Sequence, residues 1–304
     1  MVRYDVIIIG AGPAGLSAAL YAGRAGFNTL VLERMVLGGR VILTEKIENY
    51  PGIDKGILST DLIKNMEVQI RQFDNVDILF EDVKAVDFNL KKVFTEKNYY
   101  EAEGFIIAVG AKEKRLNVKG EKEFLGKGVS YCAICDGPLY KNKEVVVVGG
   151  GDSAVEEALY LSRFCSKVRL IHRRDKFRAS RILQERLQKT SNVEQILNSI
   201  ILEIKGDKQV KEVLIKDVIS EDLQSIQCSG VFIYVGIEPN TDFLKGLINM
   251  DEYGFILTDE NMATSCEAVF ACGDCRRKSL YQIITACAEG AIALNSLQGY
   301  LLKK

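Results

Sequence analysis

The stretch Asp5-Val-Ile-Ile-Ile-Gly10-Ala-Gly12-Pro-Ala-Gly15 leads from a β-branched segment directly into a glycine-rich turn. The residues that follow, 16–25, are rich in Ala and Leu and predict a helix. In such a unit the first glycine permits a tight turn and the second lets the backbone approach a diphosphate. The third lets the helix pack closely on the strand. The stretch therefore predicts an α/β dinucleotide-binding fold.

The same unit occurs again in Glu144-Val-Val-Val-Val-Gly149-Gly-Gly151-Asp-Ser153-Ala154. A helix is predicted from Val155 to about Phe164, and a second strand follows each predicted helix, over 29–32 and 168–171. The N–H groups at the start of each helix suit a diphosphate. A glycine-rich turn without a ligand is the alternative for each copy. We expect two Rossmann-like, three-layer dinucleotide-binding domains.

The two copies differ where their second strands end. The first ends at Glu33, an acid that can bond an adenosine ribose hydroxyl. The equivalent place in the second copy holds His172, followed by Arg173, Arg174 and then Arg178. Arginines pair with a ribose 2′-phosphate, which an acid would repel. The first site therefore suits FAD or NAD and the second NADP(H), unless the arginines are only a solvated basic strand end.

Domain boundaries follow from the duplication. A charged, glycine-spaced segment, 112–127, is expected as one crossing linker, and 238–241 as the other. The remaining tail is too short for a third domain and is expected to return to the first. We therefore expect a discontinuous FAD-binding domain over 1–112 and 246–304, with an NADPH-binding domain over 113–245 inserted in it.

A formal net charge of -1 argues against nucleic acid as a partner and against an anionic membrane surface. The apolar run 6–21 is interrupted by glycines and a proline, and it lacks the charged lead of a signal peptide. No other apolar stretch approaches the roughly 18 residues of a membrane helix. We expect a cytoplasmic protein. Because His172 is the single histidine, a His-rich metal site is excluded.

The segment Cys132-Ala-Ile-Cys135-Asp136 lies just before the second strand-turn-helix unit. Thiols at this spacing can close a disulfide, and a helix N-terminus there would lower the pKa of one thiol. Dithiol exchange needs a thiolate to attack and then a proton for the departing thiolate. With no histidine nearby, Asp136 is the available proton shuttle. A helix N-cap is the simpler role for it.

A second pair, Cys272 and Cys275, encloses Gly273-Asp274 after a predicted strand over 268–271. An aspartate there commonly faces the ribityl chain and phosphates of a flavin, which would make both cysteines its buried neighbours. The alternative is half of a zinc site completed by the first pair; we expect no metal. The other cysteines fall singly in helical or strand patterns and are expected in the core: Cys165, Cys228, Cys266 and Cys287.

Over essentially its whole length the chain resembles bacterial-type, low-molecular-weight thioredoxin reductases. The motifs that carry the likeness are Gly10-Ala-Gly-Pro-Ala-Gly15, Glu48-Asn-Tyr-Pro-Gly52, Gly128-Val-Ser-Tyr-Cys132-Ala-Ile-Cys135-Asp136-Gly137, Gly149-Gly-Gly-Asp-Ser-Ala-Val-Glu-Glu157, His172-Arg-Arg-Asp-Lys-Phe-Arg178 and Gly273-Asp274. Related flavoproteins with a large dimerisation domain carry a CxxxxC near the first glycine motif. A cysteine pair inside the second nucleotide domain sets this family apart.

The resemblance implies an NADPH:disulfide oxidoreductase that passes electrons through FAD and the dithiol to thioredoxin or a thioredoxin-like protein. It implies a homodimer whose NADPH domain rotates, with Cys135 nearer the flavin and Asp136 as acid and base. The implied FAD site comprises Gly10, Gly12, Gly15, Glu33, Asn49, Gly273, Asp274 and Gln282. The implied NADPH site comprises Gly149, Gly151, Ser153, Arg173, Arg174 and Arg178.

Four positions around the expected flavin site depart from the family pattern. Tyr281 stands where arginine is usual, Arg40 where glutamine is usual, and Val109 and Cys272 replace smaller residues. These departures bear on the flavin potential and on the electron donor. Alternatives are a related flavin reductase with another partner or with ferredoxin as donor, and a non-catalytic redox sensor. The chain retains the second glycine turn, the arginines and the CxxC pair. This disfavours ferredoxin as the donor and disfavours a non-catalytic sensor.

Overall fold

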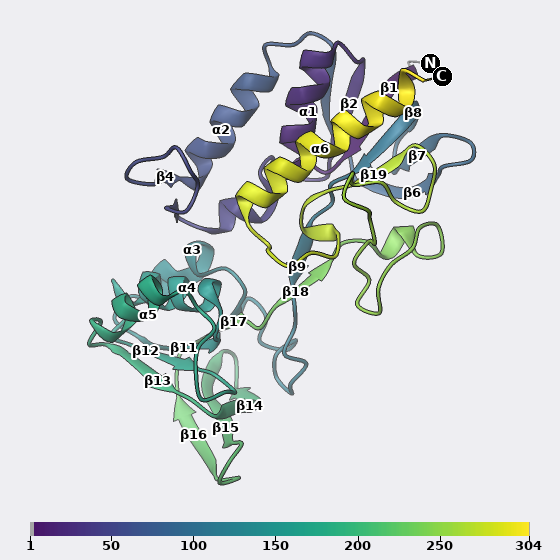
Figure 1. Cartoon of the computed structure of the whole chain (residues 1–304). Helices are drawn as coiled ribbons and strands as arrows, with labels where there is room; N and C mark the ends of the chain where they lie inside the picture. Colours follow the sequence, from purple (N-terminus) through teal and green to yellow (C-terminus); the bar gives the residue numbers. More distant parts are fainter. Residues whose placement is uncertain (1–2, 304) are drawn as a thin grey trace. The chain divides into compact units, whose positions relative to one another are not determined.

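The computed structural model describes residues 3–303 and divides into two compact units (Figure 1). Unit 1 is formed by Met1–Lys112 and Glu238–Lys304, and unit 2 by Glu113–Ile237. The second unit is thus an insertion in the first. No helix in the described part of the chain combines the length and the apolar character needed to cross a membrane.

Unit 1 is built on a parallel sheet whose central strands are buried hydrophobic runs, as expected for a sheet covered on both faces. Its neighbouring strands are, in order, β5 (Val76–Phe80), β2 (Thr29–Glu33), β1 (Arg3–Ile9) and β8 (Tyr99–Ile107). The C-terminal half of β8 pairs in parallel with β19 (Val269–Ala271). Its N-terminal half pairs antiparallel with β7 (Lys92–Thr95), which continues to β6 (Val83–Asp87).

Helices α1 (Pro13–Ala25) and α6 (Ile283–Leu301) pack side by side on one face of this sheet (Figure 1). A Cβ at Gly290 would lie 2.1 Å from the carbonyl oxygen of Ala14, so the two helices approach this closely only because Gly290 has none. Helix α2 (Ser59–Ile70) packs against α1. Side chains of β6 and β7, which extend the sheet, and of the segment around Leu244 pack with the residues of its other face.

Unit 2 repeats the plan with a five-stranded parallel sheet. Its order is β10 (Val129–Ser130), β17 (Gly230–Tyr234), β11 (Glu144–Gly149), β12 (Lys167–Ile171) and β13 (Val193–Ile196). One face carries α3 (Ala133–Asp136), α4 (Asp152–Ser162) and α5 (Arg181–Gln188). The other carries an antiparallel sheet of β14 (Ser199–Gly206), β15 (Val210–Asp217) and β16 (Leu223–Gln227).

The four-valine run of β11 shows why the sequence folds this way. Val145 and Val147 pack among α4 and α5, whereas Val146 and Val148 pack among β14, β15 and β16. Alternate residues of a strand point to opposite faces, so a run of valines suits a strand that is buried twice. The two predicted strand-turn-helix units form as β1–α1–β2 and β11–α4–β12. The predicted α/β fold with two Rossmann-like units is confirmed.

One of the two expected domain boundaries is correct. The first unit breaks after Lys112 as expected, and the second crossing overlaps the expected linker 238–241, but unit 2 ends at Ile237 and not at residue 245. Leu244 is fully buried in the core of unit 1, and the Asn240 side chain donates to the carbonyl of Val109 at 3.0 Å, so this segment belongs to unit 1. Most of 112–127 is not a linker either, because Phe124 is buried in the core of unit 2. Only the short paired strands β9 (Ala111–Glu113) and β18 (Ile237–Pro239) make the crossings.

Candidate active site

The first glycine turn connects β1 to α1. A Cβ on Gly10 would lie 2.4 Å from the Ala108 carbonyl oxygen, and one on Gly15 would lie 1.9 Å from that of Gly10. Both positions therefore require glycine. Apart from its two chain neighbours, no described residue has a heavy atom within 4 Å of a Cβ placed on Gly12. Helix α1 begins at Pro13 and, within the described chain, has neither a side-chain cap nor an acid in its first turn. Its first N–H groups thus suit an anionic ligand.

Polar side chains predicted at the flavin site lie in unit 1, among them Glu33, Asn49 and Gln282. The Glu33 carboxylate accepts hydrogen bonds from the backbone N–H of Ala11 at 2.9 Å and of Met35 at 3.0 Å, so it is fixed beside the turn. The Asn49 side-chain amide donates to the Gln282 side-chain oxygen at 3.0 Å. Two residues far apart in sequence, both predicted at one flavin site, are therefore brought together at the start of α6.

Gly273 and Asp274 follow β19 and begin η4 (Gly273–Cys275). The Gly273 N–H donates to the Glu289 carboxylate of α6 at 2.8 Å. The Asp274 carboxylate lies 3.6 Å from the Arg40 guanidinium and 3.2 Å from the Lys278 ammonium. Lys278 also pairs with Glu289 at 3.3 Å. These half-buried and buried groups form one charged network that ties η4 to α6.

Cys272 and Cys275 flank Asp274 and are fully buried. Burial raises the pKa of both thiols, that of Cys275 to about 12, so both stay protonated at neutral pH. Among residues 3–303, no group of three or more His, Cys, Asp or Glu side chains is placed to hold a metal. The two thiols thus lie as buried, unreactive neighbours of Asp274.

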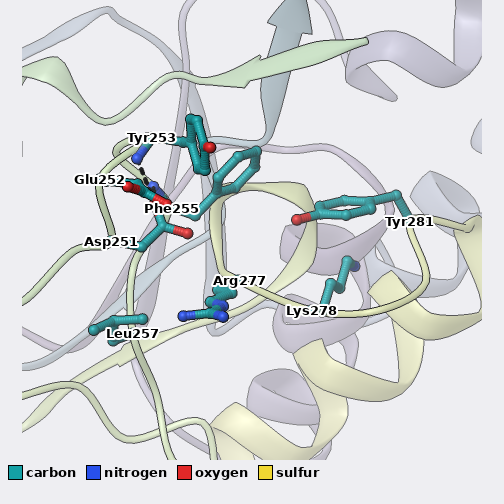
Figure 2. Close-up of a pocket in the computed structure, with 8 residues that line it drawn as sticks. All are labelled: Asp251, Glu252, Tyr253, Phe255, Leu257, Arg277, Lys278 and Tyr281. Carbon is teal, nitrogen blue, oxygen red and sulfur yellow. Dashed lines mark hydrogen bonds between the residues drawn. The ribbon is translucent and has the colours of Figure 1, made fainter.

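Tyr281, where the family pattern has arginine, lines a surface pocket of unit 1 (Figure 2). Its ring is tilted against Phe255 with the centroids 5.7 Å apart. The Lys278 ammonium lies 5.5 Å from the centroid of the Tyr281 ring. Burial raises the pKa of Tyr281, so its hydroxyl is neutral. At the position immediately before Gln282, this chain therefore has an aromatic side chain, Tyr281, where the family pattern has a charged arginine.

The second glycine turn connects β11 to α4. A Cβ on Gly149 would lie 2.3 Å from the Tyr234 carbonyl oxygen, and one on Gly150 would lie 2.3 Å from the His172 ring. Gly151 is the N-cap of α4, and apart from its chain neighbours no described residue has a heavy atom within 4 Å of a Cβ placed on it. Asp152 puts an acid in the first turn of α4, but its carboxylate accepts a hydrogen bond from the Ser180 N–H at 2.6 Å. Ser153 next to it is exposed.

Arg173, Arg174 and Arg178 are exposed on the segment that follows β12. The backbone N–H of Arg178 donates to the Gly150 carbonyl at 2.7 Å, which holds this segment against the glycine turn. His172 is instead buried and stacks on Phe177, with ring centroids 5.5 Å apart. The arginines, and not the histidine, are therefore the side chains of this strand end that a ligand at the turn can reach.

Titration of His172 should report this cationic environment. Burial lowers the pKa of the imidazole, and Arg178, Arg174 and Arg173 lower it further. Because the folded pKa lies below 6.5, the unfolded chain binds more protons than the folded chain as the pH falls below 6.5. The His172 contribution to stability is thus complete above pH 6.5 and is lost as the pH falls through the folded pKa.

As the only histidine, His172 gives a single imidazole signal in a proton NMR titration. We expect its midpoint below 6.5, and we expect Arg178→Gln to raise it, since one nearby positive charge is removed. A midpoint at or above 6.5 in the unmodified protein would contradict the buried placement.

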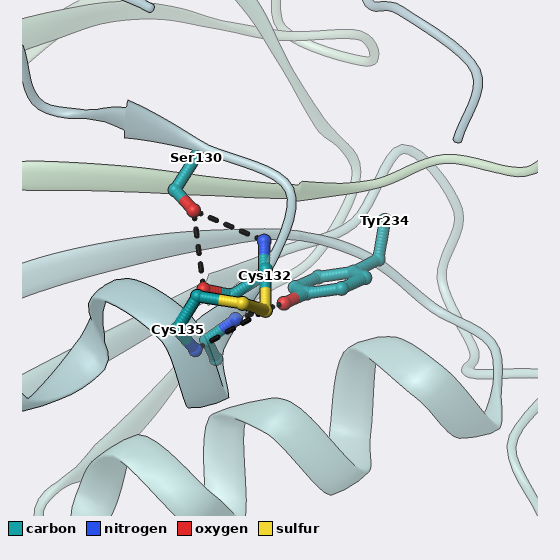
Figure 3. Close-up of a disulfide and its surroundings, with 5 residues drawn as sticks. Ser130, Cys132, Cys135 and Tyr234 are labelled. Carbon is teal, nitrogen blue, oxygen red and sulfur yellow. Dashed lines mark hydrogen bonds between the residues drawn. A yellow bond between two sulfur atoms is a disulfide. The ribbon is translucent and has the colours of Figure 1, made fainter. Parts of the chain in front are cut away.

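Cys132 and Cys135 form a disulfide at the start of α3 (Figure 3). Cys132 is the N-cap of α3, and its sulfur accepts a hydrogen bond from the Cys135 N–H at 3.1 Å. The Ser130 hydroxyl accepts from the Cys132 N–H at 3.0 Å, and the Tyr234 hydroxyl accepts from the Ala133 N–H at 2.8 Å. Cys135 is exposed and Cys132 half-buried. The disulfide is therefore held from its Cys132 side and reachable at Cys135.

Asp136 ends α3 and is half-buried. The N-cap of α3 is Cys132, and although Asp136 precedes η2 (Gly137–Tyr140), its side chain makes no capping bond to the described residues. The alternative role of Asp136, as a side-chain cap of a helix, is thus not observed. Ser130 and Tyr234 hydrogen-bond to the segment around Cys132 and Cys135, which we call the redox loop. Neither residue was predicted from the sequence. Their signal was a polar side chain at the end of each of two otherwise apolar strands, β10 and β17.

Comparison with known proteins places these sites in a family. Residues 4–290 match the family described as pyridine nucleotide-disulphide oxidoreductase. The chain is 47% identical to a thioredoxin reductase of Listeria innocua, over 98% of this chain and 94% of that protein. It is 45% identical to one of Bacillus subtilis, over 98% and 95%. A crystal structure of Lactococcus lactis thioredoxin reductase superposes with a TM-score of 0.96 at 42% identity, covering 99% of this chain and all of that one. The chain therefore belongs to the pyridine nucleotide-disulphide oxidoreductases and, among them, to the low-molecular-weight thioredoxin reductases.

Proposed function

We propose that the chain reduces the disulfide of thioredoxin, or of a thioredoxin-like protein, with electrons that pass from NADPH through FAD to the Cys132/Cys135 dithiol. The observation that carries the proposal is the Cys132–Cys135 disulfide in the same unit as a glycine turn flanked by three exposed arginines. The relatives bear the name thioredoxin reductase, which supports the choice of partner. The same likeness supports a homodimer.

Unit 1 fits FAD because its glycine turn opens at Gly12 onto the uncapped start of α1. When bound, FAD accepts a hydride and delivers electron pairs to a disulfide. We assign the diphosphate to the turn, the adenosine ribose to Glu33, and the ring to Asn49 and Gln282. The remaining residues that we assign to FAD are Gly10, Gly15, Gly273 and Asp274.

Unit 2 fits NADPH because its turn opens at Gly151 and the arginine segment is bonded to that turn through Gly150. The guanidinium groups would hold the 2′-phosphate, since an arginine offers a planar pair of donors to phosphate oxygens. The residues that we assign to NADPH are Gly149, Gly151, Ser153, Arg173, Arg174 and Arg178.

The dithiol chemistry belongs to the loop around Cys132. Two electrons and two protons convert the disulfide to two thiols, and the thiolate of one attacks the partner disulfide. The second thiolate then attacks the mixed disulfide, releases the reduced partner and restores the Cys132–Cys135 bond. We assign Cys135 to the flavin side and Asp136 to proton delivery. The Cys135 N–H, 3.1 Å from the Cys132 sulfur, stabilises negative charge there on reduction.

Six other cysteines are free thiols, and five of them are buried. Cys266 is half-buried and packs against the core of unit 1. Free thiols in this number support action in a reducing compartment, for which we propose the cytoplasm.

Anaerobic visible absorbance of the purified protein tests the electron path. We expect NADPH, but not NADH, to bleach the flavin bands, and oxidised thioredoxin added afterwards to restore them. If NADPH bleached the flavin bands but thioredoxin did not restore them, the partner would be a disulfide other than that of thioredoxin. Failure of NADPH to bleach would point to another donor, ferredoxin first, and would overturn the assignment of the three arginines.

A further inference from the structure

Two short segments bring charged side chains to the start of α1. The Gly38 N–H donates to the Ala11 carbonyl in the first glycine turn at 2.8 Å, and a Cβ on the next residue, Gly39, would lie 3.6 Å from the Gly12 Cα. Gly38 and Gly39 have φ values of 99° and 55°, which glycine adopts without strain. The chain then enters η1 (Gly39–Leu43), and its first side chain is Arg40.

The second segment is η4, which touches the same helix start. A Cβ on Gly273 would lie 2.8 Å from the Ala14 Cβ, so η4 is pressed against the first turn of α1. The residue that follows, Asp274, meets Arg40 with a separation of 3.6 Å between carboxylate and guanidinium. Arg40 thus lies at the corner between the glycine turn and the aspartate that we assign to FAD.

A count of charges around this corner shows what Arg40 contributes. The groups that pair with one another include two carboxylates, Asp274 and Glu289, and three cations, Arg40, Arg276 and Lys278. Arg276 and Lys278 both pair with Glu289, at 2.9 and 3.3 Å, and their side chains are 13% and 6% exposed. The Arg40 side chain is 34% exposed, the most accessible of the three cations.

We propose that Arg40 strengthens the binding of the dinucleotide diphosphate at this site, and that it holds the Asp274 carboxylate in place. The inference rests on the proposed FAD function. With Arg40 present the three cations outnumber the two carboxylates that they pair with, which favours an anionic ligand. With a neutral residue two cations would face two carboxylates, and this excess positive charge would be lost. Glutamine, which the family pattern has at this position, can hydrogen-bond but cannot supply that charge.

The test compares Arg40→Gln with Arg40→Lys in the FAD-loaded protein. Release of FAD on dilution, followed by flavin fluorescence, gives the dissociation constant at each salt concentration. At low salt we expect Arg40→Gln to weaken FAD binding about tenfold or more, and Arg40→Lys to change it by less than about threefold. Because salt screens a charge contact, the gap between Arg40→Gln and the unmodified protein should shrink as salt rises toward 1 M. Arg277→Gln is the matched control, since Arg277 is an exposed arginine of the same unit outside this network.

Two results would overturn the proposal. One is an FAD affinity of Arg40→Gln equal to that of the unmodified protein. The other is an equal loss of affinity in Arg40→Lys and Arg40→Gln at all salt concentrations, which would mark a steric role. Thermal unfolding of the FAD-free variants shows whether the fold itself changed. If the unmodified protein bound no FAD, the proposed function would fail as well, whereas a null effect of Arg40→Gln alone leaves that function standing.

Discussion

Replacing Cys132 and Cys135 together by serine is expected to reduce thioredoxin reduction by at least about a thousandfold while NADPH still bleaches the flavin. The two thiols act as one unit, because the second must resolve the mixed disulfide that the first forms. Either single substitution should therefore cost as much activity as the double one. The measurement is NADPH consumption with thioredoxin as acceptor, beside stopped-flow absorbance of the flavin without it.

The single variants also identify the attacking cysteine. The variant that retains the attacking thiol should trap the partner as a mixed disulfide, visible on a non-reducing gel. Cys266→Ser is a suitable control, since Cys266 is a free, half-buried thiol outside the redox loop. Activity of the double variant within tenfold of the unmodified protein would mean that electrons reach thioredoxin by another path, and the dithiol mechanism would be wrong.

The sequence predicted those parts of the fold that single residues determine locally. Gly10 and Gly15 are required because the backbone passes within 2.4 and 1.9 Å of where a Cβ would be, and such positions leave a readable pattern. The valine run 145–148 was equally informative, since only a strand buried on both faces uses four in succession. Both features are local. The second copy repeats the first glycine as Gly149, and the first copy has a β-branched run, 6–9, in place of the valines.

What the sequence missed depends on contacts between distant segments. The bond from the Ala133 N–H to the Tyr234 hydroxyl joins residues about a hundred positions apart, and no local pattern announces it. The end of the second domain was placed too late, at residue 245, because Leu244 joins the core of unit 1 through contacts that depend on the finished fold. The family likeness implied that Asn49 and Gln282 lie at one flavin site, but the hydrogen bond between their side chains was not predicted. Helix α5 buries just Leu183 and Leu187, too few apolar positions for a clear helical period.

Replacing Arg173, Arg174 and Arg178 together by glutamine is expected to lower kcat/KM for NADPH by about a thousandfold and to change that for NADH by less than about threefold. Each charge-assisted contact to a phosphate is worth about 1.5–3 kcal/mol, so loss of two such contacts already accounts for the effect. NADH lacks the 2′-phosphate and has no such contact to lose. The substitutions should leave the loop in place, because the bond that ties it to the turn runs from the Arg178 backbone to Gly150.

Steady-state kinetics with both coenzymes checks this, and Arg181→Gln is the matched control. The Arg181 side chain is 93% exposed and pairs with Glu185 on α5, so it is an arginine of the same unit on a different element. If rates with NADPH and NADH fell together, the arginines would be acting on the shape of the turn and not on the 2′-phosphate. If the NADPH preference persisted, specificity would lie elsewhere in unit 2. Both units have a glycine turn, but only unit 2 has arginines at the end of β12. A loss of activity with NADPH alone would therefore establish that these arginines, and not the glycine turn, distinguish NADPH from NADH.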